Sequence, residues 1–327
     1  MMKFNLKNAI LAFMILLIGS VFAIQIESQK QDIHPDKNKG YFMGDVKVQV
    51  GDVVVKSPRA ELDIEPKTKK ASLATFFDKP YAYQIKDNKK HEVKADIIKV
   101  SLINKVITAQ NNAQTNVLRD KKPIVIITAN EQEYNTNTNL MTATGNVVVN
   151  YEDMVATADK AYALLDKKSD VKNLKLLSRA TVKQNQNIIK GDAIRYSKLR
   201  HDIIVSGNTL SDVTFNNGDR VIINARTQQY NRMDNTMIAV GAVHICYSDY
   251  IADGPKAIMY INPATNKPKK IIFLGRSKIV EKGTNSVEAD KITMIMEPKQ
   301  FKAEGNVKST IEQNSNNNDD NKLEFKL

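Results

Sequence analysis

Apolar and polar residues alternate along most of the chain beyond residue 40, and this period of two predicts β-strands. The clearest stretch starts at the turn Gly145-Asn146 and runs through Val147-Val148-Val149. After a polar corner at 151–153, the alternation resumes at 155–160. No window of twelve residues beyond residue 26 has the 3.6-residue period of an amphipathic helix. We therefore predict an all-β body.

A small residue followed by a polar residue or proline recurs within this pattern at an average spacing of about 33 residues. It stands where an apolar alternating run passes into a second alternating run. A fixed period of this length is typical of stacked units that cannot bury their apolar faces alone. The second members of the pairs are Arg59, Asp96, Asn130, Asp159, Asp192, Arg226, Pro255 and Asp290.

Glycine turns supply a second, independent marker with the same period. From Gly145 onward their spacings are 62, 34, 34 and 30 residues, and 62 is close to two periods. Two markers with one period predict about eight repeats of ~33 residues, built as an elongated slotted β-jelly roll or β-solenoid of stacked antiparallel strands. The glycines are Gly44, Gly145, Gly207, Gly241, Gly275 and Gly305.

The ends of the chain differ from the repeats. Residues 1–26 combine Lys3 and Lys7 with an apolar run and a small-residue cleavage site at 21–23, which predicts a cleaved signal peptide or an uncleaved N-terminal membrane anchor. Residues 27–39 are polar and predict a linker. The repeats fill 40–310, with a division into two units at about 40–140 and 141–310 left open. The Asn-rich stretch 311–327 predicts a disordered tail.

The charge balance limits the classes of binding partner that we expect. The chain has 48 Lys and Arg against 36 Asp and Glu, a formal net charge of +12. An exported basic protein suits anionic envelope material, such as a phosphorylated lipid, better than nucleic acid. The alternative is that dispersed lysines keep the sheet edges soluble.

The side chains that usually carry catalysis or bind metals are scattered. The four histidines lack metal-ligand spacing, so we predict no metal, no cofactor and no enzyme. The single Cys246 lies among Val243, Ile245 and Tyr247, which predicts a strand and a buried thiol. The recurring aspartates of the first marker have two interpretations: a carboxylate ladder of a calcium-binding or glycan-cleaving β-helix, or hydrogen-bond acceptors at strand corners.

The turn at Gly145-Asn146-Val147, the following segment 151–161 and the repeat length resemble the OstA-like family. This family includes the lipopolysaccharide-transport proteins LptA and LptC and the N-terminal domain of LptD. The resemblance covers about residues 40–310 and implies a V-shaped β-jelly roll with an apolar groove. By this resemblance the chain carries lipopolysaccharide, or a similar acylated envelope lipid, from inner to outer membrane. The resemblance also implies end-to-end strand pairing with other Lpt-type proteins or with copies of the chain itself, in the periplasm.

Nine aliphatic residues on one predicted face of the best-defined strands are candidates to line the groove, which we expect to be apolar throughout. A shift of one residue would exchange the two faces and invert the set. Three alternatives stay open: an LptC-like component tethered by residues 9–26, a purely structural envelope β-solenoid, and a glycan-active enzyme. The nine candidates are Val147, Val149, Val155, Ile189, Ile204, Ile222, Ile238, Ile272 and Ile292.

Overall fold

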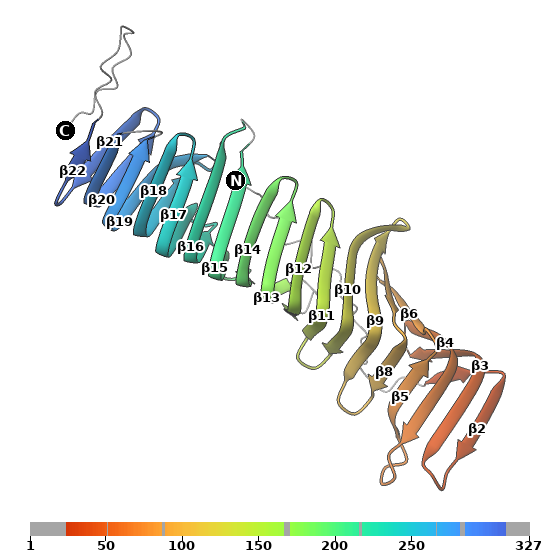
Figure 1. The fold of residues 1–327 in the computed structure, drawn as a ribbon. Helices are drawn as coiled ribbons and strands as arrows, with labels where there is room; N and C mark the ends of the chain where they lie inside the picture. Colours follow the sequence, from red (N-terminus) through yellow and green to blue (C-terminus); the bar gives the residue numbers. More distant parts are fainter. Residues whose placement is uncertain are drawn as a thin grey trace. The chain divides into compact units, whose positions relative to one another are not determined.

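The computed structural model describes residues 24–311 except 51, 87–88, 167–170, 216–217, 266 and 282–284. The predicted targeting segment up to residue 23 and the predicted tail from residue 312 lie outside the described residues. The described part contains 22 β-strands and no helix, which confirms the all-β prediction (Figure 1). Consequently, none of these residues belongs to a helix that could cross a membrane.

The chain divides into two compact units, and the boundary between them lies between Ser178 and Arg179. The N-terminal unit, up to Ser178, begins with short strands and continues with long ones. Its strands are β1 (Gln25–Glu27), β2 (Lys30–His34), β3 (Lys39–Val50), β4 (Val53–Ile64), β5 (Ala71–Phe77), β6 (Tyr81–Lys86), β7 (Lys89–Lys94), β8 (Ile97–Ser101), β9 (Val106–Arg119), β10 (Lys122–Asn135), β11 (Leu140–Tyr151) and β12 (Met154–Leu165).

The C-terminal unit begins within β13 (Val171–Gln184), the strand that contains the boundary. Most of its strands have 11 to 14 residues and follow one another as hairpins (Figure 1). They are β14 (Asn187–Ser197), β15 (Asp202–Thr214), β16 (Arg220–Asn231), β17 (Thr236–Tyr247), β18 (Tyr250–Ile261), β19 (Pro268–Glu281), β20 (Ser286–Met296), β21 (Lys299–Glu304) and β22 (Lys308–Thr310).

Successive strands pair antiparallel within each unit, as predicted for stacked repeats. The predicted linker at 27–39 differs from the structure. β2, at Lys30–His34, pairs with β3 through the register Lys30↔Met43 to His34↔Lys39. A polar sequence forms a strand here because β2 is an outer strand whose side chains are mostly exposed.

The long strands consist of two halves that belong to two layers. β4 pairs with β5 through residues 59–64 and with β6 through residues 53–56. In β11 the break between the halves is a two-residue corner at Gly145 and Asn146, where φ is +80° and +49°. The β11–β12 ladder shifts at this corner. Such corners bend the strands and let an apolar interior form between the two layers.

The two sequence markers meet at these corners. At five of the described corners the second residue of a small–polar pair places its side chain against the glycine of the following strand, where any Cβ would collide with it, and Gln29 meets Gly44 in the same way. Asn306 donates a 2.7 Å hydrogen bond to the carboxylate of Asp290, and Asn112 donates one of 2.9 Å to Asp96. These two aspartates accept hydrogen bonds at corners. The residue–glycine contacts are Gln29 with Gly44, Asn130 with Gly145, Asp192 with Gly207, Arg226 with Gly241, Pro255 with Gly275 and Asp290 with Gly305.

Buried aliphatic and aromatic side chains fill the space between the layers of each unit. In the N-terminal unit, Phe76, Ile98 and Val117 are at most 1% exposed. In the C-terminal unit, Phe273 and Ile292 are fully buried. Alternate residues of each strand thus form the core, and the residues between them form the outer face.

Candidate functional site

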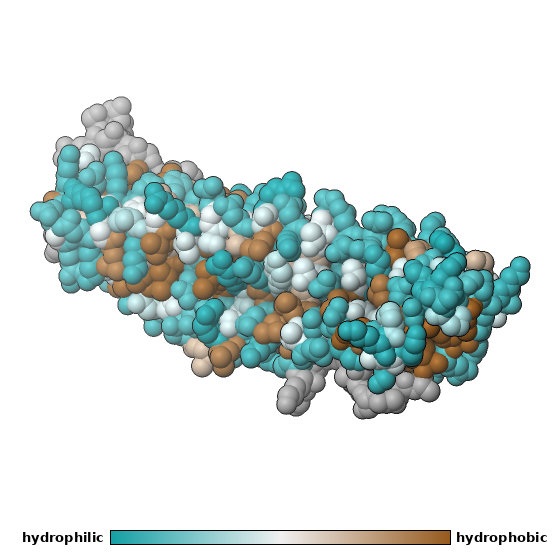
Figure 2. All heavy atoms as spheres, turned by 90° about the horizontal axis from the view of Figure 1, so that it is seen from below, coloured by the Kyte–Doolittle hydropathy of each residue, from teal (hydrophilic) through white to brown (hydrophobic). Residues whose placement is uncertain are grey.

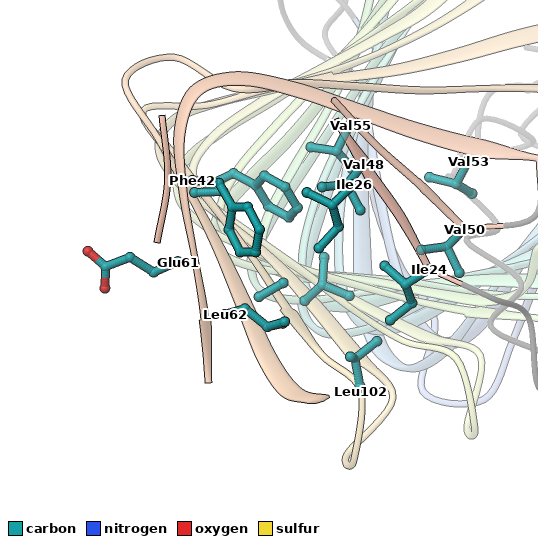
Figure 3. A pocket seen from close by; sticks show the side chains of 14 residues that line it. Ile24, Ile26, Phe42, Val48, Val50, Val53, Val55, Glu61, Leu62 and Leu102 are labelled. Atoms are coloured by element: carbon teal, nitrogen blue, oxygen red, sulfur yellow. The ribbon is translucent and has the colours of Figure 1, made fainter. Parts of the chain in front are cut away.

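An apolar pocket lies between the two strand halves at the beginning of the N-terminal unit (Figure 3). One wall comes from the first residues of the described chain, the second half of β3 and the first half of β4. The other wall comes from the first half of β3, the second half of β4, and the strands β5 and β8. The first wall is formed by Ile24, Ile26, Val48, Val50, Val53 and Val55, and the second by Phe42, Ala60, Leu62, Ala74, Phe76, Val100 and Leu102.

The chemistry of this pocket suits a hydrocarbon. It holds about 660 Å³ of empty space, counted with the part open to solvent. Glu61 also borders it, but its carboxylate points away from the apolar side chains in Figure 3. The walls present no polar side chain to a ligand, so binding would come from removing apolar surface from water, at about 0.8 kcal/mol per buried methylene.

Apolar side chains also reach the outside of the molecule in patches between hydrophilic ones. Figure 2 shows one such patch over the end of the N-terminal unit, where β2 and β3 lie. Among the exposed apolar residues of that end are Ile33, at 56%, and Met43, at 49%. Met43 is the register partner of Lys30, so the exposed Met43 side chain belongs to the β2–β3 pair at this end of the unit.

The interior is not apolar throughout, which corrects the expectation from the sequence. Gln132 is 3% exposed and accepts a 2.6 Å hydrogen bond from the Thr115 hydroxyl. Its amide nitrogen donates to the backbone oxygens of Ala113 and Ile127, at 3.0 and 3.1 Å. Gln132 follows the marker at 129–130 and Ile127 precedes it, so one side chain links the two halves of the strand near the corner.

The C-terminal unit repeats this arrangement. Gln228, 2% exposed, accepts a 2.6 Å hydrogen bond from Ser211. Its amide nitrogen bonds to the Thr209 hydroxyl at 2.8 Å and to the Ile223 carbonyl at 2.9 Å. Buried amides with all these partners are stable in an apolar interior, because their polar atoms remain hydrogen-bonded.

The structure places the nine candidate lining residues on both faces. Val147 is 1% exposed, Ile292 is fully buried, and both point inward. Val149 and Ile189 also face inward, opposite the buried Ala156 and Ser211. The remaining five lie on the outer face, between buried or partly buried neighbours in the same strand, and so do not line the interior. They are Val155, Ile204, Ile222, Ile238 and Ile272.

The candidates lie on both faces because the parity of the inward residues differs between strands and, in some strands, changes within the strand. In β12, Ala156 and Ala158 point inward before the marker, and Ala161 and Ala163 point inward after it. The inward residues are therefore even-numbered in one half and odd-numbered in the other. A bulge of this kind re-aims the side chains that follow it.

Sequence reasoning also missed part of the pocket. Ile24 and Ile26 had been assigned to the targeting segment, yet both line the pocket, and β1 pairs with the second half of β3. The alternation Ile24-Gln25-Ile26 was a usable signal. It was hidden because it continues directly from the apolar run before it.

A smaller apolar hollow in the C-terminal unit is lined by Tyr250, Ile279, Val287 and Phe301, among others. The rings of Tyr250 and Phe301 lie 5.1 Å apart. The Tyr250 hydroxyl donates a 3.0 Å hydrogen bond to Glu281. Burial, together with that carboxylate, raises the pKa of Tyr250 to about 12, so the ring stays neutral at physiological pH.

Cys246 is not buried in the core, contrary to the prediction. It is partly buried on the outer face of β17, between Ile245, which points inward, and the partly buried Tyr247. Its sulfur lies 3.3 Å from Nε2 of His244. The described residues contain no group of three or more His, Cys, Asp or Glu side chains arranged to hold a metal ion.

Comparison with known proteins gives a family signature in the N-terminal unit. No curated protein matches the chain. One similar solved structure is LptH from Pseudomonas aeruginosa, described as the LptA-homologous periplasmic component of the lipopolysaccharide transport device. It is 14% identical, covers 38% of this chain and 83% of its own, and has a TM-score of 0.33. Residues 126–176 match the family model of the LptA/LptD N-terminal domain lipopolysaccharide transport proteins, which confirms the predicted resemblance to the OstA-like, LptA-like family.

Proposed function

We propose that this chain acts in lipopolysaccharide transport as a periplasmic carrier that holds acyl chains in an apolar slot between its strand halves. The observation that carries the proposal is the pocket formed by Phe42, Val48, Leu62 and their neighbours, which presents only apolar side chains. The family signature at 126–176 supports the same role. Lipopolysaccharide, or a similar acylated envelope lipid, is the proposed cargo.

The physical basis is that apolar contacts are non-directional. An acyl chain in a slot lined by valine, isoleucine and leucine gains nearly the same free energy at neighbouring positions, since each methylene contributes about 0.8 kcal/mol wherever it is buried. Small displacements along the slot are therefore inexpensive. Net transport in one direction then requires an external source of energy, which in this family is an ATP-driven transporter.

The proposed partners bind by strand pairing. Among the described strands, β1 and β2 pair only with β3, and β21 and β22 pair only with β20. Each of these edges has unpaired backbone groups that can extend a sheet of another molecule. We propose that other Lpt-type proteins, or further copies of this chain, add strands at these edges to form a bridge.

A binding assay with a pocket-filling variant tests the proposed carrier function. Ala74→Trp should place an indole between the two walls and lower the affinity for a fluorescent fatty acid, or for lipopolysaccharide as its competitor, by at least about tenfold. Lys56→Trp, on the exposed outer face of β4, is the matched control and should bind like the parent chain. If the parent chain binds neither ligand, the carrier proposal fails, and a purely structural envelope β-solenoid becomes the better explanation. Equal affinity in the parent and Ala74→Trp would place binding elsewhere.

The mode of attachment is a separate question from cargo binding. A tether formed by the apolar run that precedes Ile24 would make the chain an LptC-like membrane component, and cleavage would release it as an LptA-like one. The N-terminal residue of the mature protein, read by mass spectrometry after expression with its own leader, distinguishes these two roles.

A further inference from the structure

Three side chains on the outer face of the C-terminal unit form a relay that ends at the only cysteine of the chain. His244 Nδ1 lies 2.7 Å from Oδ1 of Asp253, and His244 Nε2 lies 3.3 Å from the sulfur of Cys246. His244 and Asp253 are register partners on β17 and β18. His244 and Cys246 are two residues apart in β17, so they point to the same side of the sheet.

The order of the groups determines the tautomer of the neutral imidazole. A carboxylate can only accept a hydrogen bond, so the Nδ1 atom of neutral His244 carries the proton and donates it to Asp253. The Nε2 atom is then left with its lone pair toward the thiol. A nucleophile within hydrogen-bond reach of a base, and a base oriented by a third group, is the arrangement that activates nucleophiles in proteins.

The residues around the thiol indicate which class of reactant can approach it. Cys246 stands in a row across four strands with Ile222, Ile251 and Val280, which are successive register partners on the outer face. Ile251 is 45% exposed. The polar groups lie in the adjacent row, where Asn224 and Lys278 flank the His244–Asp253 pair. An open apolar shelf beside an activated thiol favours uncharged organic reactants over ions.

We propose that Cys246 is a base-activated nucleophile and a site of covalent modification by small, uncharged organic disulfides. Nε2 of His244 takes the thiol proton while the Cys246 sulfur attacks one sulfur of the disulfide. The disulfide S–S bond breaks as the new S–S bond to Cys246 forms. The leaving thiolate then takes the proton from the imidazolium. One disulfide is consumed, one mixed disulfide and one thiol are formed, and no other oxidant is required.

The modification should persist once formed. The chain has no second cysteine, so no intramolecular thiol can displace the attached group. Release requires an external thiol. Asp253 acts only through His244 and is therefore a positioning residue.

The reaction rate of the full chain with 4,4′-dithiodipyridine tests the proposal, with release of 4-thiopyridone as the signal and intact mass as the check for the adduct. The matched control is the double variant C246S/I238C. Ile238 lies on the same strand and face, between Gln229 and Ile258 in register, with no charged partner there. We expect Cys246 to react at least about tenfold faster than the cysteine at position 238, because a positioned base accelerates proton removal. We expect His244→Gln to abolish this difference.

Equal rates for the parent chain and the control variant, or an unchanged rate in His244→Gln, would overturn the proposal. All substitutions lie on the outer face, and circular dichroism confirms that the variants fold. Asp253→Asn gives a second measure: the ¹⁵N shifts of the His244 ring should show loss of the Nδ1-protonated tautomer, together with a slower reaction. Retention of that tautomer and of the parent rate would exclude the role of Asp253.

Discussion

The hydroxyl of Thr115 donates a 2.6 Å hydrogen bond to the side-chain oxygen of Gln132, and both residues are buried near the corner where the strands change layer. The amide of Gln132 also bonds to the backbone oxygens of Ala113 and Ile127. Thr115 and Ile127 are register partners in one strand half, whereas Gln132 belongs to the other. This network therefore connects the two strand halves across the corner.

Replacing Gln132 with leucine should destabilise the N-terminal unit. The apolar side chain would remove the acceptor of the Thr115 hydroxyl and the side-chain hydrogen bonds to the Ala113 and Ile127 carbonyls, at a cost of about 1–3 kcal/mol. Guanidinium unfolding should show a lower midpoint. Gln31→Leu on the exposed strand β2 is the control, and its midpoint should not move. A double-mutant cycle with Thr115→Val should give a coupling energy; strict additivity would contradict the shared network.

The loss of stability caused by substitutions at Gly145 should depend more on backbone conformation than on side-chain size. Its φ of +80° is in the region that asparagine tolerates and β-branched residues avoid. Asn111 occupies the equivalent corner position of β9 with a φ of +60°. Any Cβ at this position meets Asn130, so both variants share that cost. Gly145→Asn should still cost less than Gly145→Val, for which we expect about 2 kcal/mol or more. Thermal unfolding of both variants tests this order, and equal losses would disprove it.

Stability at acid pH should depend on Asp212. Arg220 donates two hydrogen bonds to its carboxylate, at 2.7 and 2.6 Å, and lowers the pKa of Asp212 below its usual value. The unfolded chain titrates near the usual value of about 3.9. The contribution of Asp212 is thus present above that pH and is lost as pH falls through the lower folded value.

Unfolding midpoints measured between pH 6 and pH 2 should accordingly fall less steeply in Asp212→Asn than in the parent chain. Asp120→Asn, at an exposed turn, should keep the steeper dependence. The prediction fails if the two variants have the same pH dependence.

Photo-crosslinking can separate the two faces of the strands. Val149 faces inward opposite Ala156, whereas Val155 is 36% exposed on the outer face of the neighbouring strand. If acyl chains occupy the slot, a photoreactive residue at 149 should yield lipid adducts in cells and one at 155 should not. Adducts at 155 alone would place the lipid outside, and adducts at neither position would argue against the carrier role.

The strand content and the repeat were predictable because both are local properties. Alternation along the chain predicts strands, and the glycine turns and the small–polar pairs mark one corner per repeat. Several corners contain no glycine, so the glycine marker does not identify them in the sequence. Asp78 and Lys79, and Asn111 and Asn112, adopt positive φ without glycine, so these repeats had only one marker in the sequence.

The sequence did not predict which side chains of a strand face inward, because that depends on how the backbone turns at each corner. In β16, Val221 and Ile223 point inward before the marker and Gln228 points inward after it, so parity changes within the strand. Ile222 and Ile272 lie outside, although their alternation looks identical to that of Val147, because the pattern alone does not determine which parity faces inward in each strand. The relay at Cys246 was equally hidden, because His244 and Asp253 meet through the β17–β18 register and not through sequence spacing.

By itself, the sequence determined that this protein is built from antiparallel strands repeated about every 33 residues, since hydrophobic alternation and turn residues act over short distances. Only the tertiary structure decided which side chains enclose the slot and which meet on the outer face. Those contacts are set by strand register and by the corner bulges, and both arise from pairing between segments distant in the chain.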